Sequence, residues 1–208
     1  MTCCKKILVV AAHPDDEILG CGGTMAIHAD RGDEVYVVFM TDGVSSRGSK
    51  DSLLENINQR KLSAMEACKE VGAQEPKFLS FPDNQMDSCS LLEITQGLEN
   101  IINKIKPEVI YTHHDKDLNV DHRLTHQAVM TACRPHPNNF ISEIYSFEVL
   151  SSTGWNSTSV ENIFLPNVFI DLTKAWERKM RALSFYNYEL KSYPHARSYK
   201  GVKSLAVF

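Results

Sequence analysis

Short apolar runs alternate with amphipathic segments along most of this sequence. Continuous runs rich in β-branched residues are typical of buried parallel strands, whereas apolar residues that recur every three or four positions indicate helices. By these criteria we expect strands at residues 7–12, 34–41, 77–81, 108–112, 143–149 and 167–172. We expect helices at about 20–30, 52–71, 91–105, 121–133, 173–190 and 196–208.

Strands that alternate with helices predict an α/β fold, a Rossmann-like, mostly parallel sheet with helices on both faces. With strand order 3-2-1-4-5, the first and fourth strands are neighbours at the point where the strand order reverses. Ligands of open α/β sheets bind there, outside the carboxyl ends of the strands. The sequence contains no internal repeat and no interdomain linker, so we expect a single domain over residues 1–208.

Each of the first four predicted strands ends in polar or ionisable residues: HPDDE at 13–17, TDG at 41–43, PDNQ at 82–85 and HHDKD at 113–117. The predicted strand order brings HPDDE beside the segment 113–122. One imidazole and three carboxylates within five residues are costly to crowd together without a positive charge among them. Histidine and carboxylate ligands without cysteine suit Zn²⁺, or another metal such as Fe²⁺, Mn²⁺ or Ni²⁺.

The amino-acid composition argues against some kinds of binding partner and some cellular locations. The net charge of −4 and the lack of a basic block argue against a nucleic-acid partner. No apolar run approaches the roughly 18 residues that a membrane span needs. The six cysteines show no CxxC spacing, so we expect reduced thiols and a cytoplasmic protein. The glycines at 20–23 do not match a GxGxxG dinucleotide motif, and close packing of helix against strand is the better interpretation.

Two motifs carry a resemblance to a known family. AHPDDE at 12–17, directly after the first strand, and NVDHR at 119–123 resemble the two main motifs of the PIG-L/LmbE-like N-acetylglucosaminyl deacetylases. TDG at 41–43 and PDN at 82–84 are similar as well, though less specific. The resemblance spans nearly the whole chain. It implies the LmbE-like deacetylase fold and a zinc-dependent enzyme that removes the acetyl group from an N-acetylated amino sugar (GlcNAc-type) conjugate.

The roles of the family's residues carry over by position. The resemblance implies that His13, Asp16 and His122 bind one zinc ion per chain, with Fe²⁺ or another divalent metal as alternatives. It implies that Asp15 is the general base and that the metal-bound water is the nucleophile. Three protein ligands leave one position of a tetrahedral zinc site open for water, which agrees with this assignment.

Further residues are candidates for contact with the substrate: Arg47, Arg60, Asp83, Asn119 and His195. For the two arginines, an ordinary surface position competes with contact to a substrate hydroxyl or phosphate. Asn119 stands where many family members carry a histidine, three residues before the last ligand. Asparagine can donate a hydrogen bond but cannot transfer a proton. Either Asp15 performs both proton transfers, another histidine substitutes, or the activity is weak.

Two other functions remain open from the sequence. One is a catalytically weak sugar- or nucleotide-binding protein of the same fold, and the other is a metal-dependent hydrolase of a different amide or a phosphoester. Family members continue beyond the segment that corresponds to the last residues here, so we expect a member shortened at its C-terminus. The expected partner is a small-molecule N-acetylated sugar conjugate. The sequence does not identify its aglycone and leaves homo-oligomerisation open.

Overall fold

The computed structural model describes residues 4–46, 53–135, 140–156 and 159–207. Five strands form one sheet: β1 (Lys6–Ala11), β2 (Glu34–Thr41), β3 (Lys77–Phe81), β4 (Val109–His113) and β5 (Glu143–Phe147). Their order is β3-β2-β1-β4-β5, and every pairing between neighbours is parallel. The predicted α/β class, strand order and neighbourhood of the first and fourth strands are therefore confirmed.

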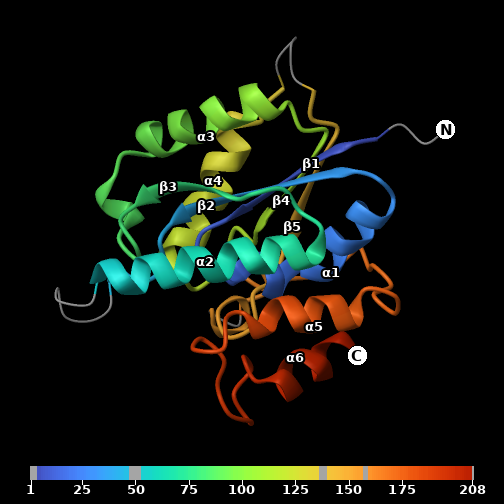
Figure 1. Cartoon of the computed structure of the whole chain (residues 1–208). Helices are drawn as coiled ribbons and strands as arrows, with labels where there is room; N and C mark the ends of the chain where they lie inside the picture. Colours follow the sequence, from blue (N-terminus) through green and yellow to red (C-terminus); the bar gives the residue numbers. More distant parts are fainter. Residues whose placement is uncertain (1–3, 47–52, 136–139, 157–158, 208) are drawn as a thin grey trace.

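Helices cover both faces of this sheet (Figure 1). On one side lie α3 (Leu91–Ile105) and α4 (Val120–Ala132), which pack against each other. On the other side lie α1 (Asp16–Asp30) and α2 (Leu53–Val71), with α5 (Trp176–Ser184) packed against both. The final helix, α6 (Tyr199–Ala206), lies beyond α5. Two 3₁₀ turns, η2 (Met86–Ser88) and η3 (Thr153–Trp155), follow β3 and β5.

Strand β1 lies at the centre of two separate hydrophobic cores. Ile7, Val9 and Ala11 pack toward α1, α2 and α5, whereas Leu8 and Val10 pack toward α3 and α4. Successive side chains of a strand point to opposite faces, so a strand with helices on both faces must be apolar at every position. This explains the uninterrupted apolar run at the start of the sequence. No helix within the described ranges has the combination of length and hydropathy that a membrane span requires.

Helix α1 begins earlier than expected, since the sequence predicted its start at the glycines 20–23. Its first residue is Asp16, so the helix opens directly after the HPD turn and carries Asp16 and Glu17 at its positive end. The glycines lie inside the helix, next to non-helical backbone at Cys21. A Cβ atom on Gly20 would lie 2.3 Å from the ring of Phe147. The interpretation of these glycines as sites of close packing therefore holds.

The predicted strand at 167–172 is wrong. These residues form no strand, and the side chain of Phe169 is 80% exposed. Leu172 lies against Gly23, where an added Cβ would come within 2.6 Å of it. The segment thus runs over the helix layer at α1, where no described strand offers it a ladder of hydrogen bonds. A strand-like sequence pattern does not produce a strand without such a partner.

The last two predicted helices are shorter than expected. Helix α5 begins at Trp176 and is preceded by Ala175, so Thr173 is not its cap. Thr173 instead hydrogen-bonds the side chain of Asp171. The chain turns after Ser184, which lets the buried Tyr186 reach Glu17 with its hydroxyl group at 2.7 Å. Helix α6 starts at Tyr199, and the side chain of Ser198 caps it.

Candidate metal and catalytic site

The turn after β1 and the first residues of α1 place four ionisable side chains in the interior. His13 is 8% exposed, and Asp15, Asp16 and Glu17 are exposed by 2% or less. Asp15 has a φ of 123°, a region that costs a residue other than glycine about 1–3 kcal/mol and occurs most often at functional sites. The backbone N–H of Asp15 donates to Glu17 Oε2 at 2.9 Å, which fixes this turn. Burial raises the pKa of Glu17 to about 8, so this carboxyl group adds little charge near neutral pH.

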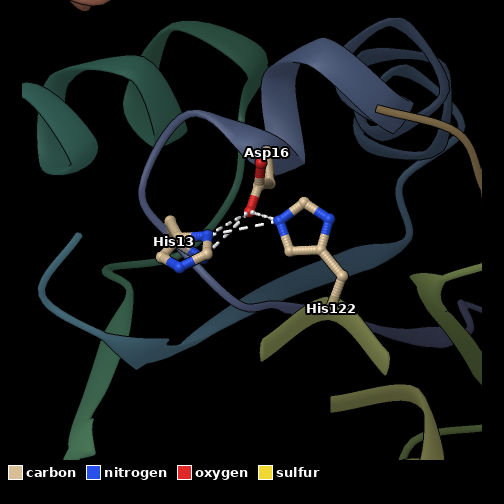
Figure 2. Close-up of side chains that lie close together, drawn as sticks. All are labelled: His13, Asp16 and His122. Carbon is tan, nitrogen blue, oxygen red and sulfur yellow. Dashed lines mark hydrogen bonds and ion pairs between the residues drawn. The ribbon is translucent and has the colours of Figure 1, made fainter. Parts of the chain in front are cut away.

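Three side chains from two distant segments converge on one point (Figure 2). Asp16 Oδ2 lies 3.1 Å from His13 Nδ1 and 3.1 Å from His122 Nε2. The two imidazole nitrogens are 3.3 Å apart. His122 lies in the first turn of α4, directly after the β4 loop, so the β1–β4 pairing brings it to the end of β1. The structure confirms the prediction that HPDDE at 13–17 lies beside the segment 113–122.

Carboxylates also hold the outer nitrogen of each imidazole. His13 Nε2 lies 3.1 Å from Asp121 Oδ2, and that carboxylate accepts the backbone N–H groups of Asn84 and Met86. His122 Nδ1 lies 3.1 Å from Asp117 Oδ1. Such contacts fix the tautomer and the ring orientation of metal-binding histidines. They direct His13 Nδ1 and His122 Nε2 toward Asp16.

When the imidazoles of His13 and His122 are neutral, the carboxylates around them have no positive charge to balance them. Burial lowers the pKa of His13, yet the carboxylates of Asp121, Asp16 and Asp83 outweigh it and raise that pKa to about 10. Burial likewise opposes ionisation of Asp16, but His122 and His13 hold the pKa of its carboxyl group well below the usual range. The surroundings therefore favour a cation between these side chains, either protons or a metal ion.

The donor set fits a divalent metal ion. Two imidazole nitrogens and one carboxylate oxygen point at a common position, and all three side chains are buried. Asp16 Oδ1 is buried without a hydrogen-bond partner, so the carboxylate has capacity left for a cation. His113 is next to the site but is a poor ligand. Its Nε2, 3.7 Å from Asp16 Oδ2, accepts the backbone N–H of Ala12 at 2.8 Å, which occupies its lone pair.

The Asp15 carboxylate contacts two arginines. Arg197 Nη1 donates to Asp15 Oδ2 at 2.9 Å, and Arg60 Nη2 lies 3.9 Å from the same oxygen. Burial raises the pKa of Asp15, and the two guanidinium groups act against that rise. The net pKa of Asp15 is raised, and the two guanidinium groups stabilise its ionised form, which is the form that can accept a proton.

The candidate substrate residues are spread around this centre. Asp83 is buried, lies 3.4 Å from His13 Nε2 and accepts the backbone N–H of Ser46. Asn119 is the N-cap of α4, where its Oδ1 accepts the N–H of Asp121, and its Nδ2 donates to the side chain of Asn84. The structure brings both of them close to the cluster formed by His13, Asp16 and His122.

Two further candidates, Arg60 and His195, contact other parts of the chain. Arg60 is 1% exposed, with Nη1 at 2.9 Å from Glu189 Oε1, so it is not the surface arginine considered above. His195 is exposed and accepts the backbone N–H of Arg197 with Nδ1 at 3.0 Å. Arg47 lies outside the described residues.

Sequence reasoning missed Asp117 and Arg197 as parts of the site. Asp117 follows the paired histidines that end β4, so its position in HHDKD was a usable signal. Asp117 also accepts hydrogen bonds from the hydroxyl groups of Ser152 and Thr153. Through these contacts it connects the η3 turn to His122. For Arg197 the available signal was the looser resemblance of residues 192–198 to the family, and no local pattern predicted that this loop returns to the end of β1.

A comparison with protein families matches residues 8–133 to the model described as PIG-L, GlcNAc-PI de-N-acetylase. The chain belongs to the PIG-L family. Within it, the chain is 35% identical to the uncharacterized deacetylase YaiS of Escherichia coli K12 over 170 residues, which cover 79% of this chain and 80% of that protein. A probable N-acetyl-α-D-glucosaminyl L-malate deacetylase of Bacillus cereus is 25% identical, over 86% of this chain and 81% of its own.

The fold of this PIG-L member also matches a solved structure. The N,N'-diacetylchitobiose deacetylase of Pyrococcus horikoshii superposes with a TM-score of 0.78 at 22% identity, covering 98% of this chain and 78% of that one. The likeness confirms the predicted LmbE-like deacetylase fold, and the family match confirms the resemblance that the two sequence motifs carried.

Proposed function

We propose that this protein is a metal-dependent hydrolase that removes the acetyl group from an N-acetylated amino sugar (GlcNAc-type) conjugate. The observation that carries the proposal is the convergence of His13, Asp16 and His122 on one point with the Asp15 carboxylate beside them. Relatives named as deacetylases of sugar conjugates support the choice of substrate class.

His13, Asp16 and His122 would hold the metal ion, and their nitrogen and oxygen donors suit Zn²⁺, with Fe²⁺ or another divalent metal as alternatives. Bound there, a divalent cation lowers the pKa of a water molecule and polarises the acetyl carbonyl group. Asp121 and Asp117 keep the two imidazoles in the orientation that this requires.

Asp15 is the general base in this proposal. It is buried beside the metal ligands, and its strained backbone is held by Glu17. Arg197 and Arg60 stabilise its ionised form, so the carboxylate can take the proton of the attacking water. Transfer of that proton to the leaving amine nitrogen then completes the cleavage of the amide bond.

We assign this second proton transfer to Asp15 as well. The Asn119 amide is not an acid, and its side chain already caps α4 and bonds Asn84. The lone pair of His113 is occupied by the N–H of Ala12, and His126 Nδ1 lies 2.8 Å from the carbonyl oxygen of His113. Neither histidine is therefore a good substitute for the one that many relatives carry.

Contact with the substrate remains proposed for Asp83 and Asn119 on the rim of the metal cluster. In this proposal Arg60 holds Asp15 in place, and His195 holds Arg197 in place. The five described cysteines are all free thiols, which supports a cytoplasmic location.

Acetate release from N-acetylglucosamine conjugates by the metal-loaded protein tests the proposal. Asp15→Asn keeps the size of the side chain but removes the base, so turnover should fall on the order of 10²–10⁴-fold at unchanged metal content. Asp115→Asn, at an exposed carboxylate, is the matched control and should retain full activity. Wild-type turnover by Asp15→Asn would contradict the assignment of the base. Binding of conjugates by the wild-type protein without acetate release would favour the catalytically weak binding protein instead.

A further inference from the structure

The segment 163–172, between η3 and α5, is apolar, exposed and without a strand beside it. Residues 163–170 have the sequence IFLPNVFI and carry no charge. No turn or bend interrupts residues 164–172, which form neither helix nor strand. Among the residues that the structure describes, no backbone carbonyl group accepts a hydrogen bond from the N–H groups of 164–172. Unpaired backbone groups flanked by apolar side chains form the kind of edge that attracts another strand.

Both ends of the segment are anchored on the protein. The ring of Phe164 lies 5.3 Å from that of His114, and the side chain of Leu172 lies against Gly23 of α1. Successive side chains of an extended chain point to opposite faces, and the two anchors are an even number of positions apart. The even-numbered residues of the segment therefore form the face toward the protein.

The odd-numbered residues form an outer face that is exposed and apolar. Leu165 and Phe169 are 72% and 80% exposed, against 50% for Val168 and 43% for Ile170. A strand that borders solvent normally has a polar outer face. The exposed apolar side chains of 163–170 offer on the order of 400 Å² of apolar surface. A patch of this size on a protein surface is often an interaction site.

Pro166 decides which edge of the segment can pair. The N–H and C=O groups of successive residues in a strand point to alternate edges, and proline has no N–H. The edge formed by the odd-numbered residues can therefore donate at every position, whereas the even-numbered edge is interrupted at Pro166. Proline on the unpaired edge also prevents a third strand from joining, so association stops at two chains.

The segment is complementary to a second copy of itself. Two strands related by a twofold axis pair antiparallel, with one residue opposite its own counterpart. With Asn167 in that position, Leu165 of each copy lies opposite Phe169 of the other, so the most exposed apolar side chains of the segment meet. The two Asn167 carboxamides then face each other, and each can both donate and accept a hydrogen bond.

The charges at the ends of the segment agree with this pairing. Glu161 of one copy lies opposite Thr173 of the other, next to Lys174. Asp171 lies opposite the uncharged Ile163. No like charges face each other across the pair, whereas such charges directly opposite would destabilise it.

We propose that two copies of this chain associate through residues 163–171, which pair as antiparallel β-strands centred on Asn167. Each copy supplies the strand that the other lacks, so the segment whose sequence predicts a strand becomes one in the dimer. Stable interfaces bury about 1,200–2,000 Å² in total, and this ribbon lies at the low end, so we expect a micromolar dissociation constant. The inference goes beyond the proposed function, and none of its tests depends on hydrolysis.

Sedimentation velocity of the full chain tests the association, at concentrations on the order of 1–200 µM, which bracket a micromolar dissociation constant. We expect the mass of one chain at the lowest concentration and of two chains at the highest. The mass of a single chain at every concentration would overturn the inference and leave this surface to a different partner.

Two exposed phenylalanines provide matched variants. Phe169→Glu places a carboxylate on the paired outer face and should weaken association at least about tenfold. Phe140→Glu makes the same change at an exposed residue before β5 and should leave association unchanged. Circular dichroism checks that both variants are folded. A folded Phe169→Glu variant that dimerises as well as Phe140→Glu would contradict the interface.

Cysteine cross-linking tests the position of the axis. In the proposed pair the two Asn167 Cα atoms are about 5.5 Å apart, within the roughly 4.4–6.8 Å that a disulfide spans. Asn167→Cys should therefore give a disulfide-linked dimer on mild oxidation, seen on a non-reducing gel above the wild-type background. Thr173→Cys, which the pairing keeps far from its own counterpart, should not. Equal cross-linking of the two variants, or none in either, would overturn the pairing centred on Asn167.

Discussion

Arg197 and Asp15 are 182 residues apart in the sequence, yet Arg197 Nη1 lies 2.9 Å from Asp15 Oδ2. The contact joins the loop before α6 to the turn after β1. Ser151 and His195 hold the arginine from two other sides, through its Nε and its backbone N–H. The C-terminal part of the chain therefore contributes a side chain to the candidate catalytic site.

Replacement of Arg197 should reduce catalysis without loss of metal. A hydrogen bond to a charged group contributes about 1.5–3 kcal/mol, so Arg197→Gln should lower kcat/KM by about 10- to 100-fold. Arg197→Lys should recover only part of this, because a flexible ammonium group does not reproduce the rigid guanidinium group, whose Nε and Nη1 bond Ser151 and Asp15 at the same time. Steady-state kinetics beside metal analysis measures both effects.

Arg178 provides the control for this prediction. It forms a partly exposed ion pair with Asp30 at 2.6 Å, far along α1 from Asp15. Arg178→Gln should change kcat/KM little, since such pairs contribute about 0–1 kcal/mol. If Arg197→Gln were as active as Arg178→Gln, Arg197 would have no part in the reaction.

Metal content should depend on His122 and not on His126. His122→Ala leaves only His13 and Asp16 as protein ligands, so the metal content of the purified protein should fall sharply. His126 is four residues further along α4, but its Nδ1 is engaged with the carbonyl oxygen of His113. His126→Ala should therefore keep its metal in elemental analysis. The reverse pattern would show that the ligand set is assigned to the wrong histidine.

Gly20 should tolerate no side chain. A Cβ atom at this position would lie 2.3 Å from Phe147, whose ring in turn lies 4.8 Å from that of His113. Overpacking costs typically about 1–3 kcal/mol, more than the gain in helix propensity, so Gly20→Ala should lower the free energy of unfolding. Gly154→Ala is the matched substitution at a site with open space and should be neutral within about 0.5 kcal/mol. Denaturant unfolding of the two variants decides whether the contact is as close as described.

Lys179 should make stability rise with pH in alkaline solution. Its side chain is buried, with Nζ 3.0 Å from the carbonyl oxygen of Leu19, and burial lowers its pKa from 10.5 to about 8 despite the nearby Cys21 and Glu148. Between these two values the unfolded chain binds more protons than the folded one, so the free energy of unfolding increases with pH, by at most about 3 kcal/mol.

The variant Lys179→Met isolates this contribution. Other groups titrate in the same range, but most of them are common to the two proteins, so the difference in unfolding free energy reports Lys179 and its effect on Cys21 and Glu148. That difference should change in favour of the wild type from pH 8 to pH 10.5. A constant difference over this range would mean that Lys179 has an ordinary pKa in the folded state.

The sequence was sufficient to predict a helix or strand wherever the local pattern and the burial of the segment favour the same structure. The uninterrupted apolar run of β1 and the capping box of Ser90 and Glu93 on α3 are local signals, and both elements lie where they were expected. The segment 167–172 has an equally strand-like pattern, but its partner strand is lacking among the described residues. Strand formation needs a neighbour, and the neighbour is a property of the tertiary structure.

The sequence by itself determined the α/β class, the strand order that makes β1 and β4 neighbours, and the residues His13, Asp16 and His122 that this order brings together. The class and the strand order follow from continuous apolar runs, helical patterns and the polar ends of the strands, which are short-range features, and the three residues were named by the resemblance of the HPDDE and NVDHR motifs to the family. Only the tertiary structure decided that Arg197 and Arg60 face Asp15, that Asp117 and Asp121 orient the imidazoles, and that Asn119 caps a helix. Side-chain pairing across the fold depends on packing between segments far apart in the chain, and a local sequence pattern carries no record of it.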